Sequence, residues 1–152
     1  MTFTTAHFGP IAVDETSIIE FPEGLPGFED RRRFVALQQP AHQGLVFLQS
    51  LEIAALCFLA LPVLSVRPDY RLAMTPEDLK LLGFPEDHSP EIGSEVVALA
   101  ILSLTEGEEP TVNLLSPVVI HTQTRRAVQA IRPDDRYGCR EAPLREEVAV
   151  CS

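Results

Sequence analysis

Basic residues and long apolar runs are both scarce in this sequence. Twelve Lys and Arg stand against 22 Asp and Glu, giving a formal net charge of −10, and Lys80 is the only lysine. A chain with this excess of negative charge repels phosphate backbones and anionic membranes at long range. No apolar run approaches the roughly 20 residues that a membrane-spanning helix needs. The composition therefore disfavours direct binding of nucleic acid or membranes and favours a basic protein partner.

Cysteine pairs and a targeting signal are also lacking. Cys57, Cys139 and Cys151 are odd in number, widely spaced and never form a C-x-x-C pair. This usage fits free thiols in a reducing compartment better than a disulfide framework. The first ten residues, MTFTTAHFGP, show no basic segment followed by an apolar one. We expect the protein to be cytoplasmic.

Motifs for catalysis, metals and cofactors are missing as well. The histidines His7, His42, His88 and His121 are never three or four residues apart, so no metal motif can be read from them. The stretch EGLPGF, residues 23–28, has no following Lys-Ser/Thr and no helix, so it does not resemble a phosphate-binding loop. Acid pairs occur in polar turns, where solvated loop charge is the commoner use. We expect no enzymatic activity, no metal and no cofactor.

Two basic clusters interrupt this acidic chain. Arg31 to Arg33 form a triplet directly after Glu29 and Asp30, and Arg125 and Arg126 form a pair. RNA contact is conceivable at such clusters. With acids adjacent to the triplet and a negative chain around it, local ion pairs are the favoured use.

The residues that remain predict one mainly β domain. A chain of 152 residues can bury roughly 68–70% of its unfolded surface in one core. Short β-type segments alternate with turn signals at the even spacing of an antiparallel all-β domain. The segment 55–63 is apolar on both faces, which predicts a central strand that is buried from both sides and ends near Pro62. The segments expected as strands are 3–8, 17–21, 33–38, 44–51, 55–63, 95–104, 111–122 and 126–131.

One short helix is predicted over about residues 76–82. Thr75 can cap its start, Pro76 suits the first turn, and Gly83 can end it. The apolar segment 95–104 could also pass for a helix, but its β-branched residues and the loop after it favour a strand.

A stiff, glycine-hinged elbow occupies residues 24–28, Gly-Leu-Pro-Gly-Phe. Pro26 fixes its own φ, and the two glycines can adopt the positive φ of sharp turns. The elbow is either an exposed recognition loop or a corner that folds Leu25 and Phe28 into a core. Large apolar residues in such turns usually point inward, which favours the corner.

Several separated segments, taken in order, resemble one family. They are FPEGLPGFED…FVAL, FLQSLE…LCFLALPV, PDY, TVNLLSPVVIHTQTRRAVQAI and the late Y…R…PL, spanning about residues 5 to 144. This set resembles the flagellar assembly factor FliW. The resemblance implies a small antiparallel β-barrel-like domain over residues 1–144. Residues 145–152 lie outside the matched region, and because they are charged and show no periodicity we expect them to form a flexible C-terminal tail.

The resemblance also implies a function without catalysis. A protein of this family would bind newly made flagellin and the RNA-binding translational regulator CsrA. Flagellin-bound FliW would leave CsrA free to repress flagellin mRNA, and secretion of flagellin would release FliW to capture CsrA. The alternative is a regulatory β-barrel with a small-molecule ligand, which the resemblance disfavours and which an open, polar-lined cavity would indicate.

Six residues are candidates for contact with a protein partner. Pro26 and Glu29 are expected to be exposed on the elbow. Gln49 and Ser50 close an apolar strand, and either cap backbone groups at a turn or face a partner, with capping favoured; the same two alternatives apply to Asn113. Glu52 is the acid that this chain keeps after LQS, where the family commonly has a second acid and this chain has Ile53.

Overall fold

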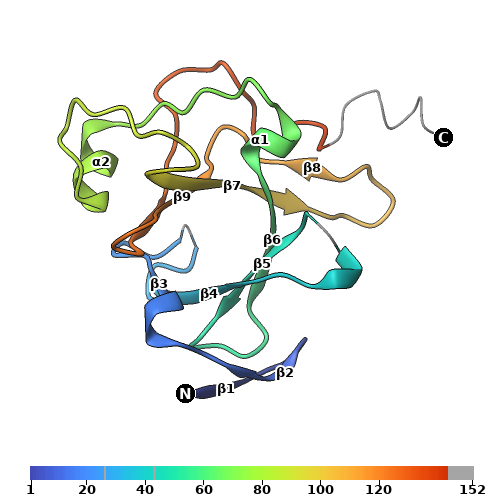
Figure 1. Ribbon diagram of the computed structural model, residues 1–152. Helices are drawn as coiled ribbons and strands as arrows, with labels where there is room; N and C mark the ends of the chain where they lie inside the picture. The colour runs from blue at the N-terminus through green and yellow to red at the C-terminus, as the bar shows by residue number, and fades with distance from the viewer. Residues whose placement is uncertain (26, 43, 144–152) are drawn as a thin grey trace.

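The computed structural model describes residues 1–25, 27–42 and 44–143 (Figure 1). Within these residues the chain is mainly β, as the sequence predicts. The helices are α1 (Val63–Val66) and α2 (Pro76–Leu82), with 3-10 turns at Glu15–Ser17 and Pro40–His42. The strands are β1 (Thr2–Thr5), β2 (Gly9–Ala12), β3 (Ile19–Glu20), β4 (Arg33–Leu37), β5 (Val46–Ser50), β6 (Cys57–Pro62), β7 (Val96–Ser103), β8 (Thr111–Val112), β9 (Val118–His121) and β10 (Ala127–Gln129).

Seven strands form a nearly closed antiparallel barrel. Their order in the sheet is β10-β9-β7-β6-β5-β4-β3, and β8 pairs with the C-terminal end of β7. The last strand meets the first through a parallel bridge between Glu20 and Arg126. At this seam the Glu20 N–H donates to the carbonyl oxygen of Arg125 at 2.9 Å. The seam removes most of the edge that an open sheet would expose.

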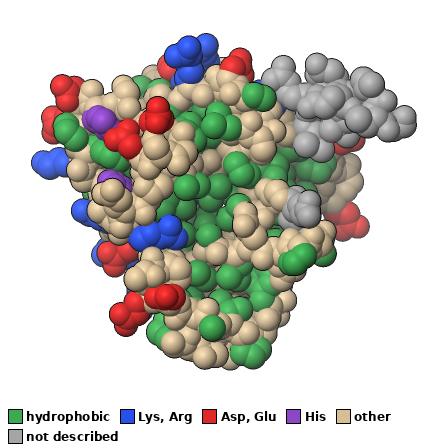
Figure 2. Space-filling view, viewed as in Figure 1, with side chains coloured by type: hydrophobic (Ala, Val, Ile, Leu, Met, Phe, Trp, Pro, Cys, Tyr) green, Lys and Arg blue, Asp and Glu red, His purple; other side chains and the backbone are tan. Residues whose placement is uncertain are grey.

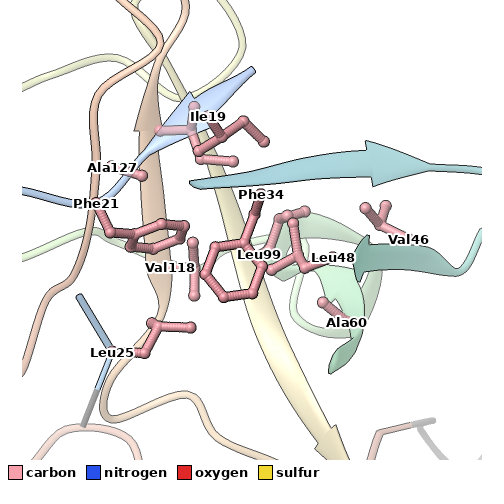
Figure 3. Packing of buried hydrophobic residues seen from close by; sticks show 11 residues of the cluster. Ile19, Phe21, Leu25, Phe34, Val46, Leu48, Ala60, Leu99, Val118 and Ala127 are labelled. Atoms are coloured by element: carbon pink, nitrogen blue, oxygen red, sulfur yellow. The ribbon is translucent and has the colours of Figure 1, made fainter. Parts of the chain in front are cut away.

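The barrel interior holds the main hydrophobic core. Side chains alternate across each strand, so every second residue points inward. Figure 3 shows the inward side chains of β3, β4, β5 and β7 converging. The buried members of this core are Ile19, Phe21, Leu25, Phe34, Val46, Leu48, Ala60, Leu99, Val118, Ile120 and Ala127.

The outer face of the barrel is covered on two sides. The hairpin β1–β2 packs on the outer residues of β4, where Val13, Val35 and Leu51 are buried together. On β7 and β9 the outer residues contact α1, α2 and their loops, in two further clusters. These strands are therefore buried on both faces over most of their length.

The predicted helix is confirmed as α2, because its signals are local. The Thr75 hydroxyl accepts a hydrogen bond from the Asp78 N–H at 3.2 Å, and Gly83 ends the helix with φ of 89°. Helix α1, one turn long, carries no such caps: Pro62 precedes it without a side-chain cap.

Three strand predictions need correction. The segment 55–63 was expected to be buried from both sides, but of β6 only Ala60 is fully buried, because the covering hairpin and α1 leave part of its outer face open. The segment 111–122 is two strands, since a turn that begins at Asn113 separates β8 from β9. The segment 3–8 was expected as a strand, but β1 ends at Thr5 and the chain turns before β2 begins at Gly9. The tail 145–152 lies outside the described residues.

Candidate interaction surface

The elbow is a corner that plugs one end of the barrel. Leu25 is buried in the core, and the Phe28 ring packs edge-to-face on Phe58 with centroids 5.6 Å apart. Gly24 and Gly27 have φ of 67° and 84°. The Phe28 N–H donates to the Leu25 carbonyl oxygen at 2.7 Å, which closes the turn. The corner interpretation of Leu25 and Phe28 is thus confirmed.

Glu29 lies on the exposed side of this corner. Its Oε2 accepts a hydrogen bond from the Gly27 N–H at 3.0 Å, so the carboxylate both fixes the turn and stays in contact with solvent. Asp30 pairs with Arg31 at 3.6 Å in an exposed ion pair, which confirms the predicted use for this arginine of the triplet. Such exposed pairs contribute at most about 1 kcal/mol. Pro26, the other candidate on the elbow, lies outside the described residues.

Glu52 connects the elbow to the turn between β5 and β6. Its Oε1 accepts hydrogen bonds from the N–H groups of Arg32 at 2.7 Å and Arg33 at 3.3 Å. One carboxylate thus binds two neighbouring backbone donors where the elbow enters β4. We define the elbow end as residues 24–33 together with residues 49–56, which this contact holds side by side.

Gln49 and Ser50 are fully buried in the elbow end. The Ser50 hydroxyl accepts hydrogen bonds from the N–H groups of Glu52 and Ile53, so the turn forms without a second acid at Ile53. Gln49 Nε2 donates to the carbonyl oxygens of Ser50 and Ala54, while its buried Oε1 has no hydrogen-bond partner. These contacts match the capping alternative. Contact of either side chain with a partner stays a prediction.

Asn113 is carried by a different part of the fold. It follows β8, and its Oδ1 accepts a hydrogen bond from the Ser116 N–H at 2.9 Å. This bond shapes the turn between β8 and β9, which again matches capping. The candidates Glu29, Gln49, Ser50 and Glu52 therefore share the elbow end, whereas Asn113 belongs to the turn between β8 and β9.

A buried arginine, which the sequence did not indicate, joins the loop before α2 to the segment after β10. Arg132 is 5% exposed, and its guanidinium binds both carboxylate oxygens of Asp134, at 2.8 and 3.1 Å. It also donates to the Tyr70 hydroxyl at 3.2 Å and lies 4.8 Å from the centroid of the Tyr137 ring. The hydrogen bonds from Arg132 hold the pKa of Asp134 below its ordinary value. Nothing in a lone arginine of a Pro-Asp-Asp turn signals these contacts, because Tyr70 is distant in sequence.

Replacing Arg132 by methionine should destabilise the fold by about 2–4 kcal/mol. The methionine keeps the apolar stem but loses the cation-π contacts, worth about 0.5–2 kcal/mol, and leaves the Arg71 carbonyl oxygen without its donor, at about 1–3 kcal/mol. Urea unfolding measures the loss. Arg136→Met, at an exposed position nearby, is the control. Equal midpoints for the two variants would show that the Arg132 contacts contribute nothing.

A stack of aromatic rings beside α2 was likewise not predicted from the sequence. The Phe84 ring stacks on His88 and on His121, with centroids 5.0 and 4.6 Å apart. His88 Nε2 lies 2.8 Å from Glu95 Oε2. A hydrogen bond from the Glu91 N–H, together with His88, lowers the pKa of Glu95. The stack fastens the loop after α2 to β9, which local sequence spacing does not reveal.

A shallow groove of about 250 Å³ lies on the part of β6 that the hairpin leaves open. Phe8, Phe47, Cys57 and Leu59 line it together with two polar residues. Burial raises the pKa of the Cys57 thiol, which keeps the thiol protonated and a poor nucleophile.

Among residues 1–25, 27–42 and 44–143, no three His, Cys, Asp or Glu side chains gather as a metal site would require. No helix in that same part of the chain is long and apolar enough to cross a membrane.

Fold and surface together define a small antiparallel barrel whose described polar side chains mainly fix turns. The comparisons with known proteins assign the family. The family model for the FliW protein matches residues 2–143. A crystal structure of the flagellar assembly factor FliW is similar with a TM-score of 0.80 and 27% identity, covering 97% of this chain and 99% of that one.

Curated relatives from several bacteria support the same family assignment. The flagellar assembly factor FliW of Pseudothermotoga lettingae is 36% identical over 135 residues, covering 86% of this chain and 80% of the relative. That of Geobacter sulfurreducens is 33% identical over 138 residues, covering 90% and 82%. That of Alkaliphilus metalliredigens is 28% identical over 148 residues, covering 96% and 88%. The chain belongs to the FliW family of flagellar assembly factors.

Proposed function

We propose that this protein is a cytoplasmic partner switch and flagellin chaperone that binds newly made flagellin and the translational regulator CsrA as alternative partners. The observation that carries the proposal is the family match over residues 2–143. An assembly factor acts by binding another protein, and the described residues provide turns and apolar surface rather than a gathered set of reactive side chains. Catalysis, a cofactor and direct contact with RNA have no place in the proposal.

Charge supports the choice of a basic or RNA-binding partner. At −10 the protein repels the phosphates that such a regulator binds, so it competes for the regulator without competing for RNA itself. Figure 2 shows acidic side chains along the periphery of one face, around an apolar middle. Summed charge of one sign raises association rates with an oppositely charged partner by about 10 to 10³-fold at low salt.

We assign the first contact with the partner to the elbow end. The exposed carboxylates of Glu29 and Glu52 lie there on backbone that the core holds rigid through Leu25. Rigid presentation lowers the entropy lost on binding. Gln49 and Ser50 act there as supports that hold the turn rather than as direct contacts.

Binding experiments with purified components test the switch. Size-exclusion chromatography should show one complex with CsrA and one with flagellin, and prior addition of flagellin should prevent the complex with CsrA. A stable ternary complex, or no complex with either protein, would refute the proposal.

Association with CsrA should slow as ionic strength rises, and the elbow end should account for more of this dependence than other acidic turns. Stopped-flow mixing at low and high salt measures it. Glu29→Gln with Glu52→Gln should lower the association rate at low salt several-fold. The matched control is Glu108→Gln with Glu109→Gln, which removes equal charge from the exposed loop before β8. A rate indifferent to salt would exclude steering by charge, and equal effects of both pairs would exclude the elbow end.

A further inference from the structure

The two ends of the barrel are filled differently. At one end the elbow inserts Leu25 and Phe28 against Phe58. At the other end a cavity of about 240 Å³ remains, which we call the barrel mouth. Figure 2 shows hydrophobic side chains gathered in the middle of the face between β7 and β4. The apolar residues lining the mouth are Ile19, Ala36, Val46, Val97, Leu99 and Ile120.

The mouth is open to solvent at its rim and closed by buried apolar side chains at its base. Ile19 is 0% exposed and Leu99 2%, while Val97 is 38% exposed, although it points inward from β7 as Leu99 does. An inward-facing valine would be buried if another element covered this end. The mouth is thus a pocket in the barrel core with direct access from outside.

Among the described residues that line the mouth, Arg125 is the one that carries a charge. Its Nε is shielded from solvent and has no hydrogen-bond partner, and its Nη2 donates to the Ser17 carbonyl oxygen at 3.3 Å. A buried guanidinium N–H without an acceptor costs about 1–3 kcal/mol. The guanidinium thus makes few hydrogen bonds within the described structure, and a guanidinium at an apolar wall is a recognition group for a carboxylate.

The backbone holds Arg125 in this place at a conformational cost. Its φ is 63°, the one positive value among the described non-glycine residues. Its carbonyl oxygen accepts the Glu20 N–H that closes the barrel seam, and its own N–H donates to His121 at 3.0 Å. Left-handed backbone at a non-glycine residue costs about 1–2 kcal/mol and persists where the surroundings fix it. The seam therefore aims the side chain from a rigid point.

We propose that the barrel mouth binds a straight-chain aliphatic carboxylate of about six to eight carbons. The cavity has room for about eight groups of the size of a water molecule, at ~30 Å³ each. This is too small for a nucleotide or another drug-sized ligand. The chain would lie on Ile19, Leu99 and Ile120, and the carboxylate would pair with the Arg125 guanidinium at the wall.

Charge favours an anion here despite the acidity of the whole protein. Repulsion by distant acids is screened beyond about 8 Å at physiological salt, whereas a guanidinium in contact with a carboxylate inside an apolar wall is not. The mouth lies at the end of the barrel opposite the elbow end. The inference is therefore independent of the proposed binding of flagellin and CsrA.

Calorimetric titration with butanoate, hexanoate, octanoate and dodecanoate tests the ligand class. We expect one site, affinity that rises about fourfold per methylene up to octanoate, and little gain beyond it. Octanol should bind at least tenfold more weakly than octanoate. Absence of octanoate binding at millimolar concentrations, or octanol binding as tight as octanoate binding, would overturn the proposal.

Variants locate the site. Arg125→Gln should weaken octanoate binding at least tenfold and leave octanol binding unchanged; Arg126→Gln is the matched control and should leave both unchanged. Val97→Phe fills the mouth without touching the guanidinium and should abolish binding of both ligands, whereas Leu104→Phe, at an exposed position just after β7, should not. Circular dichroism melts verify that each variant folds. Octanoate binding unaffected by both Arg125→Gln and Val97→Phe would place the ligand elsewhere and refute the inference.

Discussion

Gly24→Ala is expected to destabilise the protein by about 3–4 kcal/mol. The φ of Gly24 is 67°, and a Cβ built there would lie 2.4 Å from the carbonyl oxygen of Glu29 and 2.6 Å from its Cα. Both are backbone atoms, which cannot turn away as a side chain can. Left-handed strain of about 1–2 kcal/mol therefore adds to overpacking of about 1–3 kcal/mol. For a domain stable by about 5–15 kcal/mol this is a large fraction.

Gly27→Ala is the matched control, because it isolates the conformational part of this cost. The φ of Gly27 is 84°, but nothing lies within 4 Å of a Cβ built there. We expect a loss of about 1–2 kcal/mol. Since the chain has no tryptophan, urea unfolding followed by circular dichroism is the suitable measurement. Equal losses for the two variants would show that the close approach of Gly24 and Glu29 is not important. If Gly27→Ala keeps its stability yet loses partner binding, the elbow is also a recognition loop.

Features set by neighbours in sequence could be predicted. The bounds of α2 follow from Thr75, Pro76 and Gly83, which act within one turn of the chain. The strand assignment of 95–104 followed from β-branching, and the inward packing of Leu25 followed from the stiffness of the elbow. In each case the physical cause lies within a few residues of its effect.

Features that depend on distant segments could not be predicted. Whether β6 is buried on one face or two depends on how far the β1–β2 hairpin reaches across the sheet. The seam joins Glu20 to Arg125 and Arg126, and no local pattern in either segment indicates the other. Gln49 is a polar residue at the end of an apolar strand, and its burial depends on the acceptors that Ser50 and Ala54 present.

The candidate site shows the same division. Glu52 was chosen as an exposed acid, and it is exposed, but its contact with the backbone of Arg32 and Arg33 joins residues 19 and 20 positions apart. The resemblance to a family pointed to the elbow; the structure adds that the elbow and the turn after β5 form one rigid end. Pairing of acid with backbone donors across such a distance has no signature in sequence.

The proposed switch also predicts how the protein affects RNA. We expect this protein to regulate translation without touching RNA, by capturing the regulator that does. Neutralising several phosphates requires Lys and Arg clustered on one face. Here Arg31 pairs with Asp30, and the Arg125 side chain lies at the wall of the barrel mouth. One arginine of each basic cluster is thus engaged elsewhere, which supports the expectation that the protein does not bind RNA.

Gel shifts with a flagellin leader transcript measure this directly. The protein alone should leave the RNA unshifted at physiological salt, and adding it to preformed CsrA–RNA should release free RNA. A complex with CsrA needs about 800 Å² of surface from each partner, which a barrel with 8764 Å² of accessible surface can offer. Prior addition of flagellin should block the release, because both partners are proposed to bind as alternatives. Glu29→Gln with Glu52→Gln should slow the release, while Glu108→Gln with Glu109→Gln should not. A shift of RNA by this protein alone, or an intact CsrA–RNA complex after its addition, would contradict the switch.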